Sequence, residues 1–295
     1  MFGQLLTAMV TPFDERLQLD LTRLPALVEH LLDTGTTALV VCGTTGEWPT
    51  LAREERLLLF AECVRLCAGR APVLAGVGGN STAETVGFLR EVDALGVAGY
   101  SVVAPYYNRP SQEGLYRHFR AVADATDKPV LMYNIPSRTG VNIAAETQIR
   151  LSSVRNIAGV KESSGDISQI SRVIGGTGEE FYVYSGDDKY TLPALALGAD
   201  GVVSVAAHVA GLSMRRMIES FVTGDLPAAQ RLHHRLSPLF DELFRTSNPV
   251  MVKAALELLE IPVGGVRPPL VEATPEEKRE LRRVMAKVVE LPALH

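Results

Sequence analysis

Several features that mark particular classes of protein are scarce in this chain of 295 residues. It has three cysteines, Cys42, Cys63 and Cys67, and an odd number in a long chain fits thiols in a reducing compartment better than a disulfide framework. No apolar run reaches the roughly 20 residues of a membrane-spanning helix, and the N-terminus lacks the charged start of a signal peptide. We therefore expect a cytoplasmic protein with no membrane partner.

Basic runs and histidine clusters are also missing. The formal net charge is −5, so electrostatics give no support to nucleic-acid binding. The six histidines are scattered, and none forms a His/Cys group with metal-ligand spacing. We predict no metal and no nucleic-acid partner, and we interpret His208 as a polar rim residue and the pair His233-His234 as surface.

What the chain does contain is a regular alternation of two kinds of segment. Segments with helical period separate eight short apolar runs, each of which fits a strand buried on both faces. This alternation predicts a (β/α)8 TIM barrel over residues 1–224. A doubly wound sheet is the alternative, but it would require a glycine-rich phosphate-binding loop after the first strand, and the sequence has none there. The expected strands are 5–12, 37–43, 72–77, 99–107, 129–135, 157–160, 181–186 and 201–206.

The strand pattern stops after residue 224. Three segments with helical period follow, at 226–243, 249–259 and 274–291, and Asp225, Asn248 and Thr274 are plausible N-caps for them. We therefore predict a C-terminal appendage of three helices over residues 225–295.

Lys161 is the most informative single residue. The chain has six lysines against 23 arginines, and this one follows the apolar run 157–160. Burial disfavours the charged form of a lysine, and a neutral amine can form a Schiff base with a carbonyl substrate. The alternative is a structural lysine paired with Glu162 or another acid.

Other polar residues follow the expected strands, and catalytic groups of a TIM barrel gather at these strand ends. Thr44 and Thr45 fit either helix-capping hydroxyls or a cradle for a carboxylate. Tyr107 and Tyr133 fit either rim aromatics or proton carriers. Arg138 is either a solvated charge or a bidentate carboxylate ligand.

Five segments together resemble the dihydrodipicolinate synthase family, within the pyruvate-dependent class I aldolases. They follow one another in the family's order, and the resemblance extends along the whole chain. The segments are GTTGE (43–47), YYNRPSQEGLY (106–116), YNIPSRTG (133–140), VKE (160–162) and SGDD (185–188).

The resemblance implies a lyase that condenses pyruvate with L-aspartate 4-semialdehyde to 4-hydroxy-tetrahydrodipicolinate, in the diaminopimelate route to lysine. It implies a covalent imine with pyruvate and no further cofactor. The implied roles are a Schiff base on Lys161, proton transfer by Tyr133 with Thr44 and Tyr107 as relay, pyruvate carboxylate binding by Thr45, pocket lining by the backbone of Gly186 and Val203, and binding of the semialdehyde carboxylate by Arg138.

The resemblance also implies a homotetramer built as a dimer of tight dimers, in which Tyr107 enters the neighbouring subunit's site. Trp48, Arg53 and Arg56 depart from the family's lysine-inhibited members, and two arginines would repel an ammonium ligand. We therefore expect weak or absent inhibition by lysine. Two alternatives stay open, namely a related pyruvate aldolase for another aldehyde or 2-keto acid, and a catalytically silent relative that senses pyruvate-like ligands.

Overall fold

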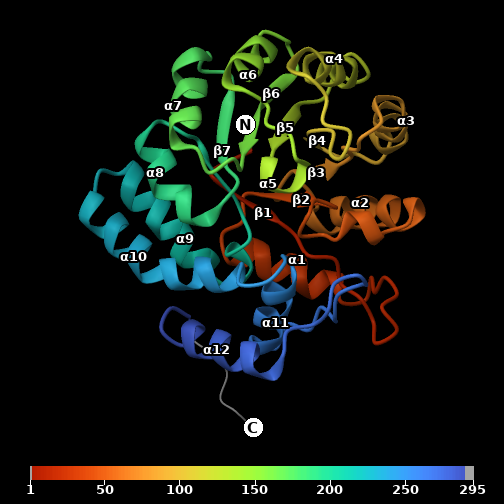
Figure 1. The fold of residues 1–295 in the computed structure, drawn as a ribbon. Helices are drawn as coiled ribbons and strands as arrows, with labels where there is room; N and C mark the ends of the chain where they lie inside the picture. Colours follow the sequence, from red (N-terminus) through yellow and green to blue (C-terminus); the bar gives the residue numbers. More distant parts are fainter. Residues whose placement is uncertain (1, 290–295) are drawn as a thin grey trace.

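The computed structural model describes residues 2–289 and contains a closed barrel of eight parallel strands in sequence order (Figure 1). The predicted TIM barrel is thus confirmed. Seven strands end before their predicted ends because the last residues of each run leave the sheet to build the rim, whereas β6 continues two residues further, to Glu162. The strands are β1 Leu5–Ala8, β2 Ala38–Val41, β3 Val73–Gly76, β4 Gly99–Val103, β5 Val130–Asn134, β6 Ile157–Glu162, β7 Tyr182–Ser185 and β8 Gly201–Ser204.

Helices surround the barrel and cover its outer face (Figure 1). Several begin where the sequence supplies a cap, as Ser81, Ser111 and Asp166 accept hydrogen bonds from the first turns of α3, α4 and α7. The long helices are α1 Leu24–Asp33, α2 Arg53–Cys67, α3 Thr82–Asp93, α4 Gln112–Ala123, α6 Ala145–Ser152, α7 Ile167–Gly176, α8 Thr191–Ala196 and α9 Ala207–Val222, and the short ones are η1 Trp48–Thr50, α5 Pro136–Thr139 and η2 Asp188–Tyr190.

The buried apolar residues form two clusters. The larger one fills the layer between the sheet and the helices. The smaller one includes Leu6, Leu74, Leu131, Tyr184 and Val203, which come from five different strands. Because side chains alternate along a strand, this second cluster fills the inside of the barrel and supports the residues at the strand ends.

The predicted C-terminal helices are present as α10 Leu226–Leu243, α11 Val250–Leu258 and α12 Pro275–Met285. They lie on one side of the barrel, where α10 and α11 pack against α9 (Figure 1). Asp225 and Thr274 cap α10 and α12 as predicted, but Asn248 does not cap α11. The predicted end of the last helix, at residue 291, lies outside the described residues. Among residues 2–289, no helix is long and apolar enough to cross a membrane.

Candidate active site

Lys161 lies in β6 directly opposite Tyr133 of β5. Its side chain is 6% exposed, and its Nζ lies 4.2 Å from the centre of the Tyr133 ring. No carboxylate within residues 2–289 forms an ion pair with this amine. A buried amine that faces a phenol and no acid is arranged for chemistry, because a structural lysine in such a place would need a paired charge.

Glu162 points to the other face of β6 and accepts only from N–H groups. Its carboxylate receives Asn134 Nδ2 at 2.9 and 3.0 Å, Gln148 Nε2 at 2.7 Å and Gln169 Nε2 at 3.0 Å. The backbone N–H of Ser164 adds a further bond at 2.8 Å. Glu162 is therefore not the partner of the lysine before it, and the interpretation of that lysine as one half of such a pair is wrong.

Thr44 and Thr45 follow β2. Thr44 and Tyr133 line the same small cavity inside the rim, so the structure brings these two predicted relay residues together. Thr45 is buried, and its Oγ1 accepts a hydrogen bond from Asn248 Nδ2 at 2.9 Å. Neither hydroxyl caps η1, which excludes the capping interpretation there.

Arg138 stands on α5 at the mouth of a larger cavity of about 340 Å³. It is exposed, and no other described residue pairs with its guanidinium. Its five N–H donors are thus available for a carboxylate ligand. Thr44 lines this cavity too, which places Arg138 and the inner site along one opening. The lining also includes Trp48, Tyr106, Ile135, Ser247, Asn248 and Leu270.

Tyr107 is the predicted site residue that does not join the others within one chain. Its side chain is 89% exposed, and its backbone has a left-handed φ of 70°. The loop around it is held in place, because Asn108 Nδ2 donates to Asn80 O and Arg109 Nε donates to Gly140 O, both at 2.8 Å. Within this chain the Tyr107 side chain therefore faces solvent and does not line the small cavity shared by Thr44 and Tyr133.

Gly186 and Val203 lie beside Lys161 and inside the barrel, respectively. A Cβ at Gly186 would come within 1.8 Å of Ser163 Oγ and 3.0 Å of the Lys161 side chain. A larger residue here would require Ser163 and Lys161 to shift, so glycine leaves the lysine in its observed position. Val203 is buried in β8 with the interior cluster.

Sequence reasoning missed Asp188. Its buried carboxylate accepts from the Ser204 hydroxyl at 2.5 Å and from the backbone N–H groups of Val205 and Ala206 at 3.1 and 2.9 Å. Burial raises the pKa of Asp188 to about 6, against the opposing effect of these donors. Asp188 thereby joins the end of β7 to the end of β8. Its place in the SGDD segment was the available signal.

The interpretation of His208 as a polar rim residue is wrong. The ring is fully buried, and its Nε2 accepts from the backbone N–H of Val10 at 3.2 Å, while Nδ1 donates to Val205 O at 2.9 Å. These two bonds fix the neutral tautomer, and burial lowers the pKa of His208 to about 4. Of the pair interpreted as surface, His234 is exposed, whereas His233 is only partly exposed.

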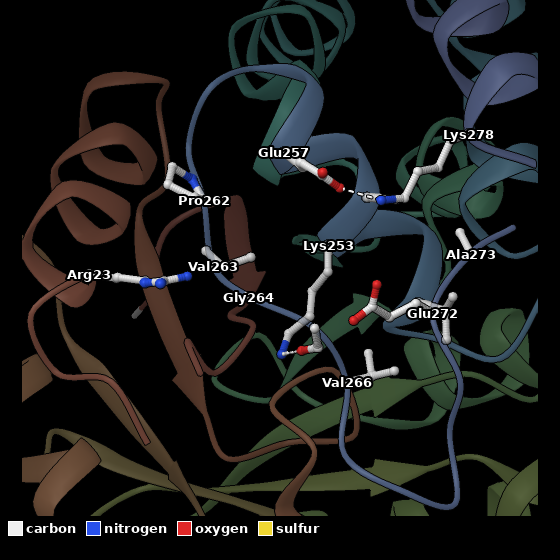
Figure 2. Close-up of a pocket in the computed structure, with 13 residues that line it drawn as sticks. Arg23, Lys253, Glu257, Pro262, Val263, Gly264, Val266, Glu272, Ala273 and Lys278 are labelled. Atoms are coloured by element: carbon white, nitrogen blue, oxygen red, sulfur yellow. Dashed lines mark hydrogen bonds and ion pairs between the residues drawn. The ribbon is translucent and has the colours of Figure 1, made fainter. Parts of the chain in front are cut away.

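A second cavity, of about 240 Å³, lies between α11 and the loop that precedes α12 (Figure 2). It contains three cations, but each is already paired: Arg23 with Glu15 and Asp20, Lys278 with Glu257, and Lys253 with Glu47. None of the predicted site residues lines it. The predicted site residues therefore lie at the strand ends and not in this cavity.

No described part of the chain brings three His, Cys, Asp or Glu residues together as a metal site. The three cysteines are free and buried, and burial raises the pKa of Cys42 to about 12. These thiols are packing residues without a thiolate at neutral pH.

Comparison with known proteins agrees with this geometry. The model of the dihydrodipicolinate synthetase family matches residues 1–288. The chain belongs to this family. It is similar to 4-hydroxy-tetrahydrodipicolinate synthase of Moorella thermoacetica, with 52% identity over 280 residues covering 95% of this chain and 96% of the relative. The Bacillus subtilis enzyme of the same name is 46% identical over 288 residues, covering 97% and 99%.

Solved structures give the same result. The dihydrodipicolinate synthase of Bacillus anthracis superposes with a TM-score of 0.97 at 45% identity, covering 98% of this chain and 99% of that one. The synthase of Cyanidioschyzon merolae, solved with lysine bound, has a TM-score of 0.95 at 44% identity and covers 97% and 98%. Members of the family therefore share the whole of this fold, appendage included.

Proposed function

We propose that this chain condenses pyruvate with L-aspartate 4-semialdehyde to 4-hydroxy-tetrahydrodipicolinate, in the diaminopimelate route to lysine. The observation that carries the proposal is the buried amine of Lys161, which faces the Tyr133 ring at 4.2 Å and has no carboxylate partner in the described chain. Family membership and relatives at about half identity, each named for this reaction, support it.

The first half of the reaction joins pyruvate to the enzyme. The Nζ of Lys161 attacks the keto carbon, and loss of water from the carbinolamine leaves a protonated imine. That imine accepts electrons when the pyruvate methyl loses a proton, so an enamine forms without metal or cofactor. Tyr133 carries the protons, with Thr44 as its neighbour in the relay. The hydroxyl of Thr45 holds the pyruvate carboxylate.

The second half forms the ring. The enamine carbon attacks the aldehyde of the semialdehyde, whose carboxylate is held by the free guanidinium of Arg138. The semialdehyde amine then attacks the imine carbon and displaces Lys161, which returns as the free amine. The backbone at Gly186 and Val203 closes the pocket around the reacting atoms.

The working assembly in this proposal is a homotetramer, a dimer of tight dimers, located in the cytoplasm. Tyr107, a tyrosine 89% exposed on a left-handed turn, supports the dimer, whereas the tetramer is what the resemblance to the family implies. In the tight dimer the Tyr107 phenol enters the partner's site and completes the relay of Tyr133 and Thr44. Each site is then fully competent only in the dimer.

Reductive trapping with borohydride tests whether Lys161 forms an imine with pyruvate. Incubation with pyruvate and borohydride is expected to leave a reduced pyruvate adduct on Lys161, located by peptide mass spectrometry, and Lys161→Ala should give none. Lys189→Met is the matched control, because Lys189 is a half-exposed lysine near the same rim that pairs with Asp187. An unlabelled wild-type chain would contradict the imine route.

Substrate choice needs a second measurement. Turnover with L-aspartate 4-semialdehyde is compared with turnover on other aldehydes and 2-keto acids. We expect the semialdehyde to be preferred. An adduct on Lys161 without semialdehyde turnover would instead favour a related pyruvate aldolase or a silent pyruvate sensor.

A further inference from the structure

The loop between β2 and η1 presents Thr44 and Thr45, and three consecutive residues of this loop are held by distant parts of the chain. Thr45 Oγ1 accepts from Asn248 Nδ2 at 2.9 Å, and Gly46 O accepts from Thr11 Oγ1 at 2.6 Å. Glu47 forms an ion pair with Lys253 at 2.7 Å. Two of these anchors come from the C-terminal segment, around the start of α11.

The ion pair between Glu47 and Lys253 is almost completely buried, with side-chain exposures of 2% and 3%. Lys253 Nζ also donates to Gly265 O at 2.7 Å and lies 4.1 Å from the centre of the Phe13 ring. Desolvation lowers the pKa of Lys253 to about 8, although Glu47 opposes this effect. A buried carboxylate needs its cation, so Lys253 fixes where Glu47 can lie.

Glu47 is also the point where the loop takes an unfavourable backbone conformation. Its φ of 56° is left-handed, which costs energy for a residue with a side chain. The second oxygen of Glu47 accepts from the backbone N–H of Arg267 at 2.9 Å. Local hydrogen bonds hold the backbone of this turn, since Glu47 N–H donates to Thr44 O at 3.1 Å and Thr50 Oγ1 donates to Glu47 O at 3.0 Å. The side chain of Glu47 is held by two C-terminal residues, Lys253 and Arg267.

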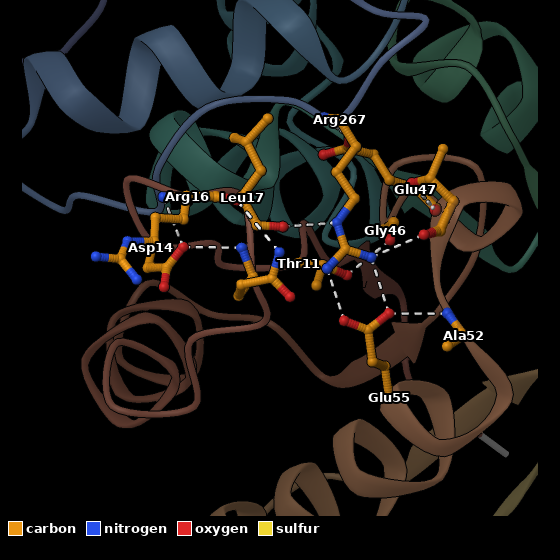
Figure 3. Close-up of polar contacts among 11 residues, drawn as sticks. Thr11, Asp14, Arg16, Leu17, Gly46, Glu47, Ala52, Glu55 and Arg267 are labelled. Carbon is orange, nitrogen blue, oxygen red and sulfur yellow. Dashed lines mark hydrogen bonds and ion pairs between the residues drawn. The ribbon is translucent and has the colours of Figure 1, made fainter.

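Arg267 forms further hydrogen bonds with this loop and with its flanking segments (Figure 3). Its guanidinium donates to Leu17 O, to Thr50 O and to both oxygens of Glu55, at 2.6 to 2.8 Å. Glu55 in turn accepts from the backbone N–H of Ala52 at 2.8 Å. Arg267 thus holds the far end of the loop while Lys253 and Asn248 hold the end that carries the threonines.

We propose that Lys253 and Asn248 are positioning residues of the active site, through which the C-terminal helices set the position of Thr44 and Thr45. This inference rests on the proposed function. Asn248 donates to Thr45 Oγ1, so the hydroxyl proton of Thr45 stays available for the pyruvate carboxylate. Lys253 holds the side chain of Glu47, two residues further on, and adds to the local hydrogen bonds that set the path of the turn.

The test uses three variants of the full chain. Asn248→Ala removes the donor to Thr45 and keeps the ion pair, whereas Lys253→Met removes the cation and keeps Asn248. Lys278→Met is the matched control. Lys278 also lies in the C-terminal segment, but it forms its ion pair with Glu257, at 2.6 Å, and does not contact the loop. The readouts are the pyruvate concentration that half-saturates borohydride trapping, kcat per trapped site, and Tm.

We expect Asn248→Ala to raise the half-saturating pyruvate concentration about tenfold or more, the scale of a hydrogen bond to a charged ligand, with a smaller change in kcat per trapped site. Lys253→Met should raise it and also lower kcat per trapped site, because Thr44 moves as well. Lys278→Met should leave both values within about twofold, since its ion pair is exposed.

A purely structural role predicts a different result. Partial unfolding lowers the number of trapped sites and Tm but leaves the half-saturating pyruvate concentration of the remaining sites unchanged. An unchanged half-saturating pyruvate concentration in both variants, with a normal adduct in the wild type, would overturn the inference. It would leave the proposed function untouched. If Lys253→Met does not fold, Asn248→Ala decides alone, because it keeps the buried pair. A wild type without an adduct would overturn the proposed function itself.

Discussion

Replacing His208 should make the chain less sensitive to acid. The ring is fully buried between Val10 and Val205, and both of its nitrogens are engaged in the neutral form. Protonation would place a charge in the core and convert Nε2 from an acceptor into an N–H donor that faces the backbone N–H of Val10. The change we consider is His208→Asn, since an amide can still accept from one side and donate to the other.

The magnitude follows from the shift in pKa. The pKa of His208 is about 4 in the folded chain against 6.5 for an ordinary histidine. The unfolded chain therefore binds a proton first as the pH falls. Stability that is fully present above pH 6.5 is lost as the pH falls toward 4. At about 1.4 kcal/mol for each unit of pH within this window, acidification from pH 7 to pH 5 removes about 2 kcal/mol.

Thermal unfolding at pH 7 and pH 5 measures this loss. About 2 °C per kcal/mol is expected for a chain of this size, so the fall in Tm between the two pH values should be about 4 °C smaller in His208→Asn than in the wild type. His118 and Asp188 are also buried and titrate with shifted pKa values, but they contribute equally to both proteins and cancel. His234→Asn, at an exposed histidine, is the control and should keep the wild-type fall. An equal fall in His208→Asn would refute the reasoning.

Two further predictions concern the assembly and its regulation. Tyr107→Phe should lower kcat by ~10²-fold or more, the scale of lost acid–base help, and mixing its subunits with Lys161→Ala subunits should restore part of the activity; near-wild-type turnover of Tyr107→Phe would contradict the relay. L-lysine should inhibit turnover weakly or not at all: Arg53 and Arg56 both lie over the Phe88 ring, Arg53 is paired with Glu91, and Arg56, which has no carboxylate partner among residues 2–289, would repel an ammonium ligand. Half-inhibition below roughly millimolar lysine would contradict the prediction of weak or absent inhibition.

The barrel could be predicted because its signals are local. Each strand is a short apolar run buried on both faces, and each helix has its own period, so the order of elements follows from the sequence alone. Element boundaries depend on contacts beyond the local pattern. The helical period of residues 212–223 marks only the later part of α9, which begins at Ala207 because the chain turns directly from the end of β8 into a helix with a kink at Ala210. The division into residues 1–224 and 225–295 stays a prediction.

The contents of the site were predictable for a similar reason. Residues at the ends of neighbouring strands must lie close together, so Lys161, Tyr133 and Thr44 could be grouped before any coordinates. Asn248 was different, because an asparagine before a helical segment is typical of an N-cap. Its contact with Thr45 spans 203 positions, and no local pattern encodes such a pairing.

The two buried lysines show where sequence reasoning reaches its limit. Lys161 and Lys253 both stand in apolar surroundings, and Glu162 directly follows the first. The sequence leaves a pair between Lys161 and Glu162 open as an alternative, and no local pattern points from Lys253 to Glu47. The structure decides both cases, because strand alternation turns Glu162 away while the fold brings Glu47 to Lys253. The lysine without a carboxylate is free to react, and the lysine with one holds the loop that receives the substrate.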